Sequence, residues 1–195
     1  MNTAPSKQLR TITSIAAKLF AKSGYHGTSM SDISEATGLG RGALYYHIKS
    51  KEDLLWECHN VFIEPILESA YEIERGAGTP EEKLRGLSET LLNMLDEYRP
   101  FVRIFHRELN ALSKVRLAKL VQRRREYEDL IERVIRSGIA EGEFEIEDAR
   151  ISVLTFLGIH NWTFEWFNPR GRLSARELSR QFMDIFLRGI QRGSR

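Results

Sequence analysis

The 195-residue sequence has a single cysteine, Cys58, and no long apolar run. One cysteine excludes an internal disulfide and a cysteine-ligated zinc site, so Cys58 is expected to be a small apolar side chain. No segment approaches the roughly 20 apolar residues needed to cross a bilayer, and the first ten residues lack the apolar core of a secretory signal. We therefore expect a cytoplasmic protein with no membrane partner.

Side chains suited to metal or catalytic chemistry are scattered along the sequence. The five histidines form no His-x-x-x-His pair, and no nucleophile, base and orienting residue can be recognised. The glycine-rich stretch Gly38–Gly42 has no strand before it and no Gly-Lys-Ser/Thr after it, which disfavours a nucleotide-binding loop. The sequence predicts no catalytic residues, no metal site and no cofactor.

Alternating β-branched runs are also absent, whereas apolar residues recur at helical spacing along most of the chain. This pattern predicts an all-α fold of about nine helices. Three helices precede residue 50, and a long connecting helix follows at about 51–74. Later helices are predicted at about 80–97, 100–112, 114–141, 146–167 and 174–191. We expect two domains, at 1–52 and 53–195.

The segment 28–54 predicts two short helices separated by a tight turn. The apolar spacing breaks at Gly38-Leu39-Gly40, where glycine can adopt the positive φ of a helix end. Ser29 and Asp32 have the spacing of a capping box, but Thr28 is an equally good N-cap, and the sequence does not decide between them. Two short helices joined in this way are typical of a helix-turn-helix, here at about 29–48, which lays its second helix in the major groove of DNA.

The charge distribution favours a polyanionic partner for residues 1–51, which we call the head. Residues 1–51 contain seven basic and two acidic residues, a net charge of +5, whereas the remainder carries −3. Charge alone does not establish DNA binding, because a basic solvated surface without a helix-turn-helix would have the same net charge. In the second helix, Arg41 can reach guanine or phosphate, and Gly42 leaves room for close backbone approach. Aromatic side chains with hydrogen-bonding tips follow, of which one is expected to pack inward.

These residues resemble the TetR family of bacterial transcriptional regulators. The similarity covers about residues 9–55 and is most specific in GALYYHIKSKEDL, residues 42–54. Gly40 departs from the family pattern, which usually has Ser or another polar residue there, and Ile48 replaces a usual Phe. Taken with the chemistry of the side chains, the resemblance implies DNA contacts by Thr28, Ser29, Arg41, Gly42, Tyr45, Tyr46, His47, Lys49 and Lys51.

The resemblance also implies a C-terminal body that forms a homodimer and binds a small effector, which releases the repressor from double-stranded operator DNA. The last two predicted helices are apolar on more than one face, as expected where a partner subunit covers them. For each of these apolar residues, packing in the core of its own subunit is the alternative to a contact with the partner subunit. The predicted dimer contacts are Leu157, Phe164, Phe182 and Phe186.

The effector is predicted to be apolar or acyl-CoA-like. The segment from Trp162 to Gly189 is similar to TetR regulators of lipid or sterol catabolism that sense acyl-CoA thioesters. Arg123-Arg124-Arg125 could recognise an anionic effector, or could form charge pairs on a solvated helix. The predicted pocket residues, for which core packing is the alternative, are Phe101, Phe105, His160, Asn161, Trp162 and Trp166. An activator or a ligand-independent DNA-binding protein of the same fold is the alternative function, and an enzyme is less favoured.

Overall fold

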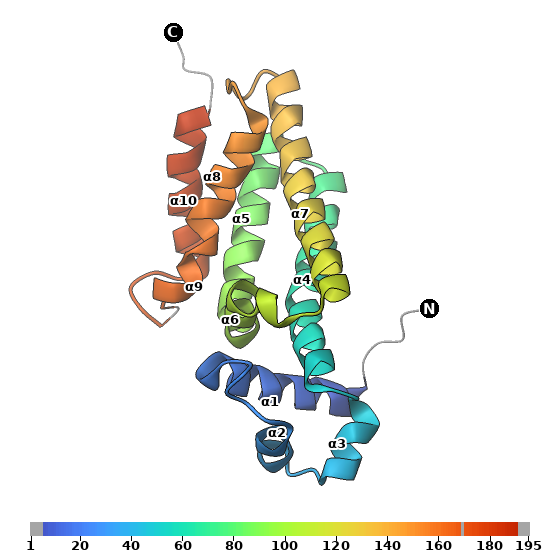
Figure 1. Ribbon diagram of the computed structural model, residues 1–195. Coiled ribbons are helices and arrows are strands. Elements are labelled where there is room, and N and C mark those ends of the chain that lie inside the picture. The colour runs from blue at the N-terminus through green and yellow to red at the C-terminus, as the bar shows by residue number, and fades with distance from the viewer. Residues whose placement is uncertain (1–5, 169, 191–195) are drawn as a thin grey trace. The chain divides into compact units, whose positions relative to one another are not determined.

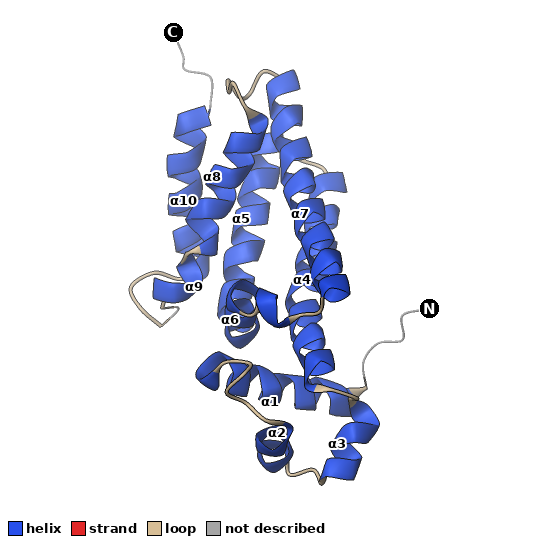
Figure 2. Cartoon of the chain, viewed as in Figure 1, coloured by secondary structure: helices blue, strands red, loops and turns tan. Residues whose placement is uncertain are grey.

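The computed structural model describes residues 6–168 and 170–190, and this part of the chain is built from helices and connecting loops without a strand (Figure 2). The all-α prediction is confirmed. Residue 191, where the last helix is predicted to end, lies outside the described residues. Within the described ranges, no helix has both the length and the apolar character required to span a membrane.

The helices follow the predicted order with two interruptions (Figure 1). The helix predicted at 100–112 ends at Arg107 and is followed by the short η1, and the helix predicted at 146–167 is divided at Trp162. The bounds are α1 Lys7–Ser23, α2 Met30–Thr37, α3 Arg41–His47, α4 Lys51–Arg75, α5 Pro80–Glu97, α6 Arg99–Arg107, η1 Leu109–Ala111, α7 Lys114–Ala140, α8 Ala149–Asn161, α9 Thr163–Trp166 and α10 Ala175–Ile190.

The chain forms two compact units. Unit 1 contains residues Met1–Ile63 and Pro100–Val121, and unit 2 contains Glu64–Arg99 and Gln122–Arg195. This division differs from a boundary after residue 52, because α4 continues as one helix past that point and residues 100–121 join the head. Contacts between segments so distant in sequence leave no local signal.

In unit 1, α1 packs against α2, and α2 contacts α3. The buried residues Ile12, Ala16 and Phe20 form the inner face of α1, as their helical spacing requires. Ile33 of α2 and Leu44 of α3 are also fully buried. Gly38 ends α2 with a φ of 70°, so glycine is needed at this left-handed position between the two short helices.

In unit 2, α5 packs against α10 and α8 around a mainly apolar core (Figure 1). A hydrogen-bonded chain of three polar side chains crosses this core. The fully buried His160 lies 2.7 Å from the hydroxyl of Ser88 through Nε2, and Ser88 lies 2.8 Å from Ser179. Nδ1 lies 2.6 Å from the carbonyl oxygen of Phe156, so Nδ1 donates and Nε2 accepts from Ser88. The neutral imidazole therefore joins α5, α8 and α10.

Candidate DNA-binding surface and effector residues

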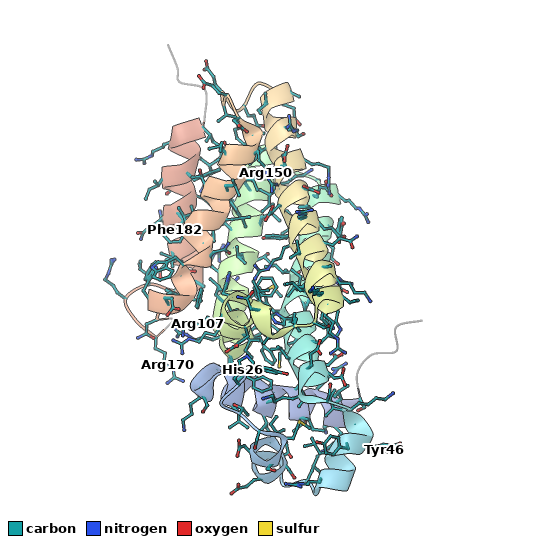
Figure 3. All side chains as sticks on the ribbon, viewed as in Figure 1. His26, Tyr46, Arg107, Arg150, Arg170 and Phe182 are labelled. Carbon is teal, nitrogen blue, oxygen red and sulfur yellow. The ribbon has the colours of Figure 1, made fainter. Side chains whose placement is uncertain are left out.

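The recognition helix α3 is anchored by apolar side chains and exposes its aromatic ones. Leu44 and Ile48, one helical turn apart, are buried, whereas Tyr45 is 47% and Tyr46 86% exposed. Tyr46 extends outward from α3 in Figure 3 and packs edge-on against the half-buried His47. None of the three aromatic residues is buried, contrary to the expectation that one packs inward, because Leu44 and Ile48 occupy the inward positions. Both tyrosine side chains are therefore accessible to a large partner.

The start of α3 is open and is linked to α2. The guanidinium of Arg41 donates a hydrogen bond of 2.8 Å to the hydroxyl of Ser31, which joins the first turns of the two helices. No heavy atom lies within 4 Å of a Cβ built on Gly40 or Gly42. Gly40 caps α3 without a side-chain hydrogen bond. The space beside both glycines is therefore open, and no side chain caps the start of α3.

Ser29, not Thr28, is the N-cap of α2. The Asp32 amide donates to the Ser29 hydroxyl at 3.1 Å, and the Ser29 amide donates to the Asp32 carboxylate at 2.7 Å. Hydrogen bonds to the Asp32 carboxylate, first from the Ser29 amide and then from the Ser29 hydroxyl, lower the pKa of Asp32 below its ordinary value. The Thr28 side chain is buried, and its hydroxyl donates to the Gly24 carbonyl at 2.9 Å. Because that hydroxyl faces inward, we leave Thr28 out of the proposed DNA interface.

Lys51 holds the loop between α1 and α2 against the start of α4. Its ammonium group donates to the carbonyls of Tyr25 at 3.0 Å and Thr28 at 2.9 Å, and it lies 4.3 Å from the centre of the Tyr25 ring. Lys49, by contrast, is exposed. The two lysines predicted to contact DNA therefore differ: Lys49 is exposed to solvent, whereas Lys51 positions the loop between α1 and α2.

Residues 108–116 contact the same part of unit 1. The carboxylate of Glu108 accepts a hydrogen bond of 3.1 Å from the Tyr25 amide. Arg116 lies 3.4 Å from Glu52 and forms a second ion pair with Asp53. Hydrogen bonds from Ser113, together with the charge of Arg116, lower the pKa of Glu52. Sequence reasoning missed these contacts, because 61 to 83 residues separate the partners.

Two family models match the sequence of this chain. Residues 12–58 match the model described as bacterial regulatory proteins, tetR family, and residues 77–190 match the model described as tetracyclin repressor-like, C-terminal domain. The chain belongs to the TetR family. As a member of this family of regulators, it is a DNA-binding transcriptional regulator and not an enzyme.

Relatives of this TetR-family regulator match over nearly its whole length. The transcriptional repressor KstR2 of Mycolicibacterium smegmatis is 29% identical over 95% of this chain and 92% of its own. The crystal structure of PfmR from Thermus thermophilus is 31% identical, with a TM-score of 0.86 over 93% of this chain and 99% of that chain. AibR, in a structure with isovaleryl coenzyme A and operator DNA, is 27% identical, with a TM-score of 0.83 over 92% and 97% of the two chains.

The predicted effector residues of this TetR-family regulator fall in both units. In unit 1, the Phe105 ring lies 4.9 Å from Phe62 and 5.9 Å from His59, and Phe101 is half-buried. In unit 2, Asn161 is half-buried, and Trp162 and Trp166 are exposed. Both ring nitrogens of His160 are engaged within the core, so we remove His160 from the proposed effector site. No group of three metal-ligating side chains occurs among the described residues.

Three of the predicted dimer contacts face the interior of unit 2. Leu157, Phe164 and Phe186 are buried within the subunit, and only Phe182 is half-buried. We therefore correct the predicted surface: the outward apolar side chains of α8 and α10 are Ile151, Leu154 and Ile185. The helical spacing of these residues could be read from the sequence. Because apolar residues lie on several faces of both helices, however, the sequence does not show which face is exposed to solvent.

Proposed function

We propose that this regulator is a repressor that binds palindromic operator DNA through α3 of each subunit of a homodimer. The observation that carries this proposal is the pair of exposed tyrosines on a helix whose opposite face is anchored by Leu44 and Ile48. Family geometry would place the two helices in major grooves about 34–36 Å apart. The proposed contacts are Ser29, Arg41, Gly42, Tyr45, Tyr46, His47 and Lys49.

Homodimer formation is proposed through the outward faces of α8 and α10. Ile185 is 74% exposed and Ile151 58%, and Leu154 lies one turn after Ile151. Where exposed apolar side chains form one contiguous patch, that patch is typical of an interaction site. The same surface of a second subunit would cover it in a two-fold arrangement.

We propose a small apolar or acyl-CoA-like effector that releases the repressor. AibR, a relative of similar fold, has been solved with isovaleryl coenzyme A and operator DNA. An effector that favours one conformation of the body would change the head through α4, because this helix contributes residues to both units. Such a repressor would act in the cytoplasm.

The test is operator binding by fluorescence anisotropy, with a duplex selected from a randomised pool by the wild-type protein. Tyr45→Ala and Tyr46→Ala should each weaken binding about tenfold or more, because a lost DNA contact costs about 1–3 kcal/mol. Lys119→Ala, an exposed lysine on α7, is the matched control and should bind as the wild type.

Unchanged affinity in both tyrosine variants would overturn the proposed interface. In cells, a reporter under the selected operator should be repressed by the wild-type protein. Activation of that reporter would contradict the repressor assignment while leaving DNA binding intact.

A further inference from the structure

One face of α1 is positively charged along most of its length. Lys7, Arg10 and Lys18 lie on the same side of this helix, because their spacing of three and eight residues is close to whole helical turns. All three side chains are exposed, and none forms an ion pair with another residue in the described part of the chain. The sequence provides no acid nearby: the first acidic residue of the chain is Asp32.

Hydroxyl groups lie between these cations. Together the side chains line one surface groove along α1, whose described lining residues are Lys7, Arg10, Thr11, Ser14, Ile15 and Lys18. Three of these six residues are cationic and none is acidic. A groove lined by charges of one sign attracts an anionic partner.

The opposite face of α1 is fixed in the core of unit 1. Ile12, Ala16 and Phe20 are buried, and the buried Cys58 thiol of α4 donates to the Thr13 carbonyl oxygen at 3.8 Å. The helix also packs against α2, which contacts α3. The cationic face therefore belongs to the same compact unit as the exposed tyrosines of α3.

The length of this cationic row suits a nucleic-acid backbone. Lys7 and Lys18 are eleven residues apart, which corresponds to about 16 Å along a helix that rises 1.5 Å per residue. A single strand of B-DNA has one phosphate about every 3.4 Å along the helix axis. A row of this length therefore extends past several successive phosphates, enough for each of the three cations to meet a different one.

A membrane surface is a less suitable partner for the same charges. A helix that lies on a membrane inserts large apolar side chains between the lipids and exposes its cations beside them. The large apolar residues Ile12 and Phe20 of α1 are instead buried in unit 1. The chain also belongs to a family of DNA-binding regulators, so DNA is already its partner.

We infer that α1 is a second DNA-binding element, which contacts the phosphate backbone beside the half-site bound by α3 through Lys7, Arg10 and Lys18. Contacts of this kind position a protein on the duplex and add affinity without reading the sequence. None of the three residues is among the contacts proposed above. The inference rests on the proposed function, since it extends the interface with the same operator.

The test measures the affinity of the full-length protein for the selected operator, with about ten added base pairs on each side, as a function of salt concentration. Arg10→Ala/Lys18→Ala removes two phosphate contacts and should reduce the slope of log affinity against log salt concentration by about 1.8. Between about 50 and 200 mM salt, the wild type should therefore lose about tenfold more affinity than this variant. The matched control is Lys114→Ala/Lys119→Ala, which removes two exposed lysines of α7 in unit 1 and should keep the wild-type slope.

Two further measurements separate a phosphate contact from a loss of folding or of sequence recognition. The reduction in slope should be as large with a duplex of unrelated sequence, because every sequence has the same phosphates. Arg10→Lys/Lys18→Arg keeps both charges and should restore the wild-type slope. Both alanine variants should melt as the wild type does, because the replaced side chains are exposed.

A wild-type slope in Arg10→Ala/Lys18→Ala would overturn the inference. An equal reduction in Lys114→Ala/Lys119→Ala would also overturn it, because net charge rather than contact would then explain the change. Binding to phosphatidylserine vesicles that is lost in Arg10→Ala/Lys18→Ala, with an unchanged operator slope, would assign the face to a membrane instead. A wild-type protein that binds no operator would refute the proposed function, whereas operator binding that depends on Tyr46 but not on α1 would refute this inference alone.

Discussion

The buried His160 should make the stability of this protein depend on pH in a defined window. Burial lowers the pKa of His160 to about 4 from an ordinary 6.5, against the smaller opposing effect of its hydrogen bond to Phe156. In the unfolded chain the imidazole gains a proton below about pH 6.5. In the folded state it stays neutral to about pH 4. Acid therefore favours the unfolded state, and stability contributed by the neutral form is lost as pH falls between these values.

The size of this loss of stability follows from the pKa values of His160 in the folded and unfolded states. Each tenfold difference in proton affinity corresponds to about 1.4 kcal/mol, so the loss from this histidine should be about 3 kcal/mol between pH 6.5 and pH 4. Full burial of the ring means that solvent screening does not reduce this figure greatly. Such a loss is a large part of the stability of a typical domain, about 5–15 kcal/mol.

Urea denaturation followed by circular dichroism at pH 7, 5.5 and 4 would measure the effect. Other groups titrate too, so the quantity to compare is the difference in the free energy of unfolding between wild type and His160→Gln, which cannot titrate there. That difference should move by about 3 kcal/mol in favour of the variant on acidification. Ser88→Ala keeps the histidine and should retain the pH dependence. A difference that stays constant with pH would refute a neutral, buried His160.

Three further outcomes are expected. Lys51→Ala should lower the free energy of unfolding by about 2 kcal/mol, because two charged hydrogen bonds and a ring contact are lost, and it should weaken operator binding measured by anisotropy. Lys49→Ala should leave the free energy of unfolding unchanged. It should reduce only the slope of log affinity against log salt concentration, by about 0.9 for one phosphate contact. Equal unfolding curves for both lysine variants would contradict the positioning role. Ser29→Ala should cost about 1 kcal/mol and speed amide exchange in α2, since it breaks the capping box; unaltered exchange would argue against the cap. Ile185→Glu should yield monomers in analytical ultracentrifugation, and a persistent dimer would exclude α10 from the interface.

The sequence determined the features that depend on near neighbours. The helical spacing of Ile12, Ala16 and Phe20 and the glycine break at Gly38 involve residues close together in the sequence, so each could be predicted from the sequence alone. The spacing of Ser29 and Asp32 predicted a capping box, but the structure was needed to choose Ser29 over Thr28 as the N-cap. Together they predicted the helix-turn-helix and, with the 42–54 motif, the family. The sequence also predicted exposed aromatic side chains on α3, but the expectation that one of the three packs inward was wrong.

The tertiary structure decided which side of each helix is buried and which distant groups meet. His160 bonds to Ser88, which is 72 residues away in the sequence, and Tyr25 bonds to Glu108, which is 83 residues away. No local sequence pattern therefore predicts either contact. The apolar faces of α8 and α10 contained both core and surface residues, and only packing separated Phe186 from Ile185. Periodicity fixes a helix, whereas the direction of its faces depends on neighbours contributed by remote parts of the chain.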